Sequence, residues 1–349
     1  MEGTASARLL DWEAAARFGS RLAGTGPVLR PSQRARIRED FSELVTEAET
    51  LVTTLTGLRV GGAPTRAWVM SRSRWISQNL KGFERVLSPL AERLSQRISD
   101  GMFSAARRKV LAVQVGGLLG YMGRKVLGQY DLFVPAEGQD VLYFVGPNVA
   151  ELEARYGFEP RDFRLWLCLH EVAHRVQFGG VPWLRPYLQN MIDGYLASIE
   201  LDGRKLIQTI RRAREEAVRG GSRELGVVFF LMTPEQRETF RRMQAVMSLL
   251  EGHGNYVMAA LSVGRIRDET RMRRTLSRRR HGPVDRVIQK AIGLDVKVRQ
   301  YALGERFVSR AVQRAGMDGF NRVWEREENL PTLEEVGRPD AWVERVAGS

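Results

Sequence analysis

The sequence has little cysteine and no secretory start. Cys168 is the single cysteine among 349 residues, so the chain cannot form an internal disulfide bond. The first residues, MEGTASARLLDWEAAARF, lack the positively charged start and sustained apolar stretch of a signal peptide. Together these two absences predict a protein of the reducing cytoplasm.

Long hydrophobic runs are also missing. The most apolar stretch, Val110–Met122, has 13 residues, whereas a helix needs about 20 to cross a bilayer. It contains Gln114 and three glycines, and basic residues precede and follow it. Such flanks are found beside membrane anchors, but the short length favours a buried helix. We therefore expect no membrane partner.

Lysine is scarce, although the chain is strongly basic. Of the 54 basic residues 48 are arginine and 6 are lysine, and the formal net charge is +13. Such a charge favours nucleic-acid or anionic partners, because clustered cations release counterions from phosphates. The densest cluster, Arg265–Gly282, has no aromatic residue on which a base could stack. A solvated surface is the preferred interpretation, and nucleic acid is not the expected partner.

No repeat and no Gly/Ser-rich or Pro-rich linker divides the sequence. We expect one domain over residues 1–349, with a helical N-terminal extension (1–66) and a core (67–349). Apolar residues recur mainly with the period of a helix, so the fold should be predominantly helical. The expected helices are Pro31–Leu55, Ala67–Asp100, Phe103–Leu127, Pro160–Phe178, Trp183–Glu200, Gly203–Arg219, Pro234–Leu261, Pro283–Ile292 and Val298–Ala315.

Two short runs have the composition of β-strands instead. Tyr130–Pro135 and Val141–Val149 are rich in aromatic and β-branched residues, and the turn-like sequence AEGQD joins them. They predict a hairpin just before the helix that starts at Pro160.

That helix carries the most informative motif of the chain, LHEVAH. His170 and His174 are four residues apart, so their imidazoles lie on one face, one turn apart, and can bind one tetrahedral metal ion. Glu171 lies beside them, where it can hold a water molecule. This H-E-x-x-H arrangement is typical of zinc metallohydrolases. The competing interpretation is a core helix, because its other residues are mostly apolar.

A catalytic zinc site needs a third protein ligand. The helical stretch MQAVMSLLEGHGNYVMAALS offers Glu251 and His253, which point about 200° apart on a helix, so one ion is not expected to take both. A carboxylate within so apolar a stretch needs a cation or metal, which favours Glu251. His253 is then a residue of the second ligand shell, the substrate site or the core. Asn255, one turn beyond Glu251, could orient a ligand.

Two glycines follow the candidate ligand Glu251. Gly252 and Gly254 remove side-chain bulk, and we expect them to let this helix approach the motif helix closely.

The chain resembles a family of zincin-like metallohydrolases that genome co-occurrence links to biosynthesis of the deazaflavin coenzyme. The resemblance covers most of the chain from about Ala67 and includes the motif helix. Its further segments are QVGGLLGYMGRKVLGQYDLFVP, FVGPNV, LLEGHGNYVM, GLDVKVRQYALGERFV and FNRVWEREENLPTLEEV. It implies an α+β zincin-type domain, with a small sheet or hairpin beside the motif helix and Glu251 as the third zinc ligand.

The predicted chemistry is zinc-assisted hydrolysis, most simply of a peptide bond in a peptide or protein substrate. Glu171 is the expected general base. Tyr256, Arg299 and Tyr301 are candidate donors to the developing oxyanion, with Tyr301 preferred. In zincins an extended substrate often joins an edge strand upstream of the motif helix, which here predicts Leu142–Gly146 as that strand.

Two other kinds of function stay open. The chain could be a zinc-containing binding or scaffold protein with an inactive site. It could also be a nucleic-acid-binding or anionic-surface protein that uses the Arg271–Arg280 cluster. The sequence does not determine the oligomeric state.

Overall fold

A computed structural model of the chain describes residues 10–61, 64–97, 105–131, 141–198, 232–279 and 295–348. The expected helices Gly203–Arg219 and Pro283–Ile292 lie outside these residues. The chain divides into two compact units. Unit 1 comprises Met1–Leu51 and Gly61–Arg175, and unit 2 comprises Val52–Val60 and Val176–Ser349.

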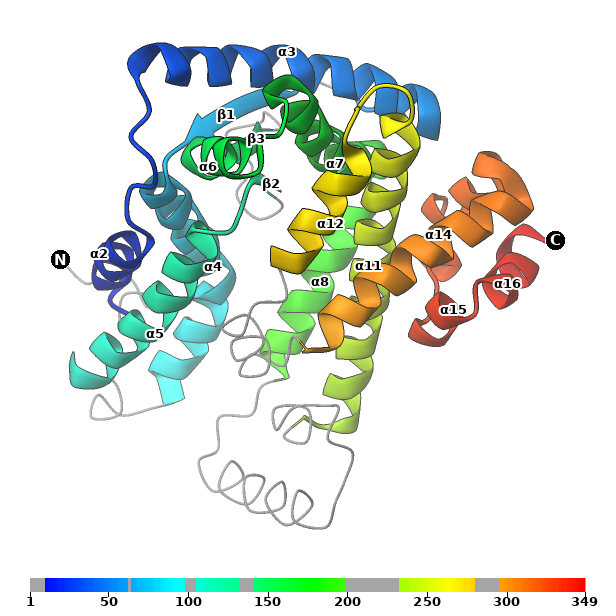
Figure 1. Ribbon diagram of the computed structural model, residues 1–349. Helices are drawn as coiled ribbons and strands as arrows, with labels where there is room; N and C mark the ends of the chain where they lie inside the picture. The colour runs from blue at the N-terminus through cyan, green and yellow to red at the C-terminus, as the bar shows by residue number, and fades with distance from the viewer. Residues whose placement is uncertain are drawn as a thin grey trace. The chain divides into compact units, whose positions relative to one another are not determined.

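Unit 1 surrounds a small sheet with helices (Figure 1). Two of its helices, α3 and α7, continue for a few residues into unit 2. Its elements are α2 (Trp12–Ala23), α3 (Pro31–Thr56), β1 (Arg66–Met70), α4 (Arg72–Arg97), α5 (Ala105–Gly123), β2 (Gly128–Tyr130), β3 (Val141–Val145), α6 (Gly146–Tyr156) and α7 (Pro160–Gly180).

The sheet has the strand order β1-β3-β2. β3 pairs with β1 in parallel and with β2 in antiparallel register, with Gln129 opposite Tyr143. The predicted hairpin is therefore confirmed in part. The prediction of Leu142–Gly146 as an edge strand is wrong, because β3 has a hydrogen-bonded neighbour on both sides.

Two boundaries near the sheet also differ from the predictions. The strand expected to reach Val149 ends at Val145, because Gly146 and Pro147 start α6, with proline in its first turn. The helix expected from Ala67 is a strand up to Met70, since Ala67–Met70 pair with β3. A partner strand distant in sequence overrides the local helical pattern here.

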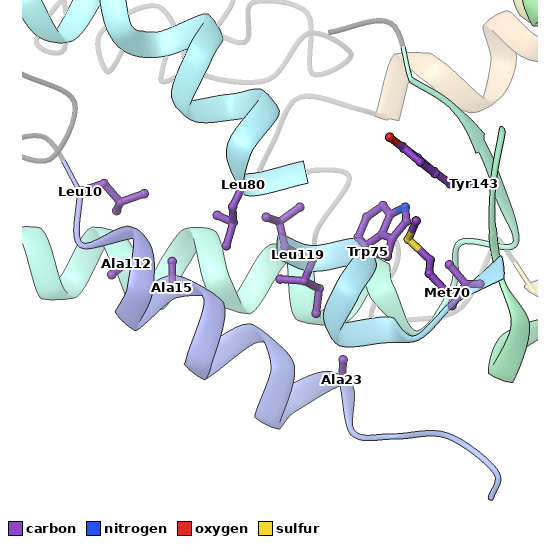
Figure 2. Close-up of a cluster of buried hydrophobic side chains, with 11 residues drawn as sticks. Leu10, Ala15, Ala23, Met70, Trp75, Leu80, Ala112, Leu119 and Tyr143 are labelled. Carbon is purple, nitrogen blue, oxygen red and sulfur yellow. The ribbon is translucent and has the colours of Figure 1, made fainter. Parts of the chain in front are cut away.

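Both faces of β3 are buried. On one face Phe144 stacks on Phe41 of α3, with ring centroids 3.9 Å apart. On the other, Tyr143 joins an apolar cluster in which Trp75 and Met70 take part (Figure 2). A strand buried on both faces reads as a continuous apolar run, as in the sequence VLYFV.

Arginines on α7 attach it to α3. Arg164 pairs with Asp40 of α3 and, through two 2.8 Å hydrogen bonds, with Glu153 of α6. Arg175, which is buried, pairs with Glu49 of α3 at 3.0 Å. Part of the arginine excess thus serves to hold the motif helix in place, and does not add to a surface for phosphate.

The apolar helix α5 is only partly buried, which corrects the prediction of a buried helix. Ala112 and Leu119 point into the cluster of Figure 2, whereas Val110 and Val113 are 58% and 47% exposed. Among the described residues, no helix is both long enough and apolar enough to cross a membrane.

Unit 2 is helical in its described residues. The C-terminal end of α3 and the last residues of α7 also belong to it. Its other elements are α8 (Leu184–Ala197), α11 (Pro234–Ser262), α12 (Glu269–Arg279), α14 (Asp295–Asn321), the 3₁₀ helices η2 (Arg322–Trp324) and η3 (Glu327–Asn329), α15 (Leu333–Gly337), α16 (Pro339–Trp342) and a terminal π-helical turn η4 (Val343–Ala347).

A pair of glycines lets α11 and α14 pack closely (Figure 1). A Cβ atom on Gly252 would lie 2.2 Å from the carbonyl carbon of Gly304, and one on Gly304 would lie 2.0 Å from the Ser248 oxygen. Gly252 was expected to face the motif helix. It faces α14 instead, because the backbone of Gly304 fills the space where its side chain would be.

The arginine cluster of α12 is partly neutralised by acidic neighbours. Arg271 pairs with Asp268 at 2.8 Å, and Arg273 pairs with Glu269 at 2.8 Å and with Glu305 of α14 at 2.6 Å.

Candidate metal and catalytic site on helix α7

Helix α7 begins where the sequence predicts. Pro160 occupies the first turn, Asp162 lies near the positive end of the helix dipole, and the helix ends at Gly180. Its apolar residues, Leu169, Val172, Ala173 and Val176 among them, have no exposed surface. The helix is therefore a core element and also carries the motif, so the two interpretations of the sequence are compatible.

The two histidines of the motif face each other. Their Nε2 atoms are 3.3 Å apart, and the rings are 4.7 Å apart with an interplanar angle of 83°. Two nitrogens bound to one tetrahedral zinc ion at about 2.0–2.1 Å would be about 3.3–3.4 Å apart. The observed separation therefore fits two ligands of a single ion. His174 is buried and His170 half-buried.

Strand β2 holds the carboxylate of the motif, that of Glu171. The backbone N–H of Tyr130 donates a 3.1 Å hydrogen bond to Oε2 of Glu171, a side chain that is 8% exposed. A Cβ atom on Gly128 would lie 2.7 Å from Oε1 and from Cγ of Glu171. Only glycine at position 128 leaves room for the carboxylate in this position.

Gly128 and Tyr130 are site residues that the sequence did not reveal. The expected strand began at Tyr130, so Gly128 lay outside every predicted element. A glycine inside a strand often marks a close approach of another group to the backbone, but this signal was lost because the strand was expected to begin two residues later.

The cysteine of α7 is unreactive because it is buried. Cys168 has no exposed surface, and burial, with the Glu171 and Glu47 carboxylates, raises the pKa of its thiol well above the ordinary value. It is a core residue and not a nucleophile.

The sequence placed the third ligand on what is helix α11, in unit 2. Glu251 is half-buried on this helix, and Asn255, one turn later, is half-buried too. Tyr256 is also half-buried, and burial raises the pKa of its hydroxyl above the ordinary value. The side chains of Tyr301 and Arg299 lie outside the described part of α14, so their proposed role as donors stays a prediction.

His253 lies in the core of unit 2. It has no exposed surface, it stacks on Phe320, and its ring is 5.5 Å from that of Trp324. Its Nδ1 is 2.8 Å from Nε2 of Gln177. The sequence left three locations open for His253: the second ligand shell, the substrate site and the core. The structure places His253 in the core.

Gln177 ties the end of α7 to α11. It is fully buried, and its Nε2 donates to the carbonyl oxygen of Leu250 at 2.9 Å as well as contacting His253. Gln177 follows His174 by less than one turn, and Leu250 directly precedes Glu251. The position of Gln177 in the sequence HRVQF, next to the motif, was the one signal of this contact.

Comparison with known proteins agrees with these features. A family model described as zincin-like metallopeptidase matches residues 10–343. The chain belongs to this zincin-like metallopeptidase family. Its match includes the motif helix and α11 as well as the N-terminal helices that the sequence had placed in an extension.

A solved structure supports the same assignment. The crystal structure of a candidate hydrolase with a novel fold, from Chloroflexus aurantiacus, is 33% identical to this chain. The similarity covers 97% of this chain and 98% of that one, with a TM-score of 0.73. None of the curated proteins compared with the chain matches it significantly. The predictions of a zincin-like family and of a predominantly helical α+β fold with a small sheet are confirmed.

Proposed function

We propose that this zincin-like protein is a zinc-dependent hydrolase that cleaves an amide bond, most simply in a peptide or protein. The observation that carries the proposal is the geometry of α7: two imidazole nitrogens 3.3 Å apart, with a carboxylate of the same motif held by β2. Membership of a metallopeptidase family supports the reaction class.

Glu251 is our proposed third ligand. Among the described residues, His170, His174 and Glu251 form the one set of His, Cys, Asp and Glu side chains that could hold a metal ion. The contact of Gln177 with Leu250 supports the choice, because it joins the end of the motif helix to the turn of α11 that precedes Glu251. Two imidazoles and a carboxylate are the donor set of many catalytic zinc sites. Asn255 would orient Glu251.

In the proposed reaction Glu171 is the general base. A zinc ion held by the three ligands supplies a Lewis acid that makes a water molecule acidic near neutral pH. Glu171 accepts a proton from the attacking water and returns it to the leaving amine. The Tyr130 amide fixes the orientation of the carboxylate, so that it is in place before substrate arrives. Tyr301 and, as an alternative, Tyr256 would donate to the developing oxyanion.

We place an extended substrate beside β2, not β3. β2 lies at one end of the strand order in the described residues, and its Tyr130 amide points to Glu171. A peptide backbone that lay along this strand would pass the general base.

The decisive experiment separates metal binding from turnover. A library of peptides is incubated with the wild-type protein and with Glu171→Gln, and the zinc content of both is measured by elemental analysis. We expect the variant to keep its zinc and to lose cleavage by about 10²–10⁴-fold, the usual contribution of a general base. Full activity in Glu171→Gln would refute the assignment of the base.

A scaffold or binding protein with an inactive zinc site is the second candidate. It predicts bound zinc in the wild-type protein and no cleavage across the same library.

The proposal has three further parts. The whole chain acts as one functional domain, it works in the cytoplasm, and nucleic acid is not its partner.

A further inference from the structure

Helices α2 and α5 pack against each other through small residues. A Cβ atom on Gly116 of α5 would lie 2.4 Å from the Ala15 oxygen of α2, and one on Gly120 would lie 2.7 Å from the Gly19 oxygen. Ala15 and Gly19 are buried accordingly. Small residues fill the centre of this contact, so several large apolar residues of both helices lie at its edge or outside it.

Several large apolar residues of the two helices are therefore exposed. On α5, Val110 is 58%, Leu111 41%, Val113 47% and Met122 39% exposed. At 100° per residue they fall on one half of the helix, where Gln114 is a polar exception. A surface helix of a globular protein normally shows the reverse pattern, with its large apolar residues inside.

The same surface continues on α2. Phe18 is 39% and Leu22 46% exposed. The Phe18 ring lies 3.5 Å from where a Cβ of Gly117 would be, and Leu22 lies 3.1 Å from that of Gly120. Phe18 and Leu22, with Val110, Leu111, Val113 and Met122, therefore form one apolar surface, here named the α2–α5 face. Contiguous apolar surface of this kind marks an interaction site.

Basic residues border the α2–α5 face. Arg17 and Arg21 lie on α2 next to Phe18 and Leu22, and all four are exposed. Lys109 precedes the exposed part of α5, and Arg124 follows α5, both with exposed side chains. Glu13 of α2 pairs with Arg17 at 2.9 Å and offsets its charge, whereas Arg21 and Lys109 keep the border positive. A positive border selects a partner with negative charge around an apolar interior.

We propose that the α2–α5 face docks on an anionic lipid bilayer. Helices that lie in the plane of a membrane bury apolar side chains at the boundary between headgroups and acyl chains, and their Lys and Arg residues contact anionic headgroups. A second copy of the chain is the less suitable occupant, because the basic borders of the two copies would face each other. The proposal is independent of the hydrolase function.

Vesicle sedimentation of the full-length protein tests the proposal. The probes are vesicles of phosphatidylcholine alone and of phosphatidylcholine mixed with phosphatidylglycerol. We expect binding to the anionic vesicles, much weaker binding to the neutral ones, and a loss of affinity as salt screens the charges. Phe18→Ser combined with Val113→Ser should weaken binding by about tenfold or more. Arg21→Gln and Lys109→Gln should each weaken it by about fivefold, on anionic vesicles only.

Matched variants in unit 2 serve as controls. Val263→Ser removes an apolar residue that is 78% exposed, and Arg241→Gln removes an exposed charge, and neither should change binding. The single variants alter exposed side chains, so their unfolding temperatures should match the wild type. The double variant also loses the packing of Phe18 on Gly117, so its binding is measured well below its unfolding temperature. The proposal is overturned if anionic vesicles do not bind the wild-type protein, or if Val263→Ser weakens binding as much as the double variant. A dimer that the double variant abolishes, without any binding to vesicles, would identify a second copy as the occupant.

Discussion

At the residue scale, the site depends on Gly128, a residue without a side chain. Gly128 leaves the space that the Glu171 carboxylate occupies, since an added Cβ would lie 2.7 Å from Oε1 and Cγ. Two atoms cannot approach so closely, so any other residue must displace either the carboxylate or the strand. The general base is thus held by its Tyr130 hydrogen bond on one side and by the close backbone of β2 on the other.

We predict that Gly128→Ala impairs catalysis while zinc stays bound. A displacement of the carboxylate by about 1 Å can lower kcat/KM by about 10²-fold. The histidines are untouched, so the zinc content should equal that of the wild type. Gly194→Ala is the matched control, because a Cβ at Gly194 of α8 meets nothing within 4 Å and should leave kcat/KM unchanged. Wild-type kcat/KM in Gly128→Ala would show that Glu171 tolerates the crowding.

A second prediction concerns Gln177, which we regard as a positioning residue for Glu251. Gln177→Leu removes the donor to the Leu250 carbonyl and to His253, so polar atoms in the core of unit 2 lose their partner. We expect the zinc dissociation constant, measured by competition with a chelating dye well below the unfolding temperature, to rise about 10- to 100-fold.

The exposed Gln189 of α8 provides the control for that measurement. Gln189→Leu should leave the zinc dissociation constant unchanged. If Gln177→Leu lowers the unfolding temperature but binds zinc with wild-type affinity, then Gln177 has a structural role only.

At the element scale, the crossing of α11 and α14 is set by Gly252 and Gly304. The backbones are so close that a Cβ on Gly252 would lie 2.2 Å from a backbone carbon, which no side-chain rotation can relieve. The two helices must move apart to accept even alanine. The helix that carries Glu251 is thereby fixed in position by its contact with α14.

We predict that Gly252→Ala destabilises unit 2 despite the better helix propensity of alanine. Alanine gains about 1 kcal/mol over glycine inside a helix, but forced separation of packed helices costs about 1–3 kcal/mol or more. Urea unfolding followed by circular dichroism should show a lower midpoint. Gly194→Ala, in the interior of α8 and without a neighbour, should show the gain alone and raise the midpoint. A raised midpoint in Gly252→Ala as well would contradict the close crossing.

The elements that the sequence predicts well carry their own end signals. α7 starts at Pro160 as predicted, and α11 starts at Pro234, where Thr233 and Gln236 form a capping box. β1 was missed, because five residues between a glycine-containing loop and a helix become a strand only through pairing with β3. Such pairing across about 75 residues of intervening chain leaves no local periodicity that would reveal it.

The residues of the candidate site also differ in how well the sequence predicts them. The spacing of His170, Glu171 and His174 on one helix is local, so the motif predicts their grouping directly. Gly128 enters the site through tertiary contact, and its role could not be derived from local pattern. For α5, the apolar run was correctly identified, but its exposed side was not, because packing through glycines reverses the usual relation between residue size and burial.

At the scale of the whole molecule, metal binding and stability should be coupled. A ligand that binds the folded chain and not the unfolded one raises stability with its free concentration. The gain is about 2.7 kcal/mol when that concentration is 100 times the dissociation constant. For units of this size, 1 kcal/mol shifts the unfolding temperature by about 2–4 °C. Zinc should therefore raise the unfolding temperature by about 5–10 °C over that of the protein treated with a chelator.

The same measurement on variants identifies the ligands. His174→Ala should lose most of the zinc-dependent shift, because a single imidazole and a carboxylate bind zinc weakly, and Glu251→Ala should lose a large part of it. His253→Phe keeps an aromatic ring between Phe320 and Trp324 and should retain the shift, although its unfolding temperature without zinc should fall because Gln177 loses a partner. If His253→Phe lost the shift and Glu251→Ala kept it, the third ligand would be His253, and the His₂Glu assignment would be wrong.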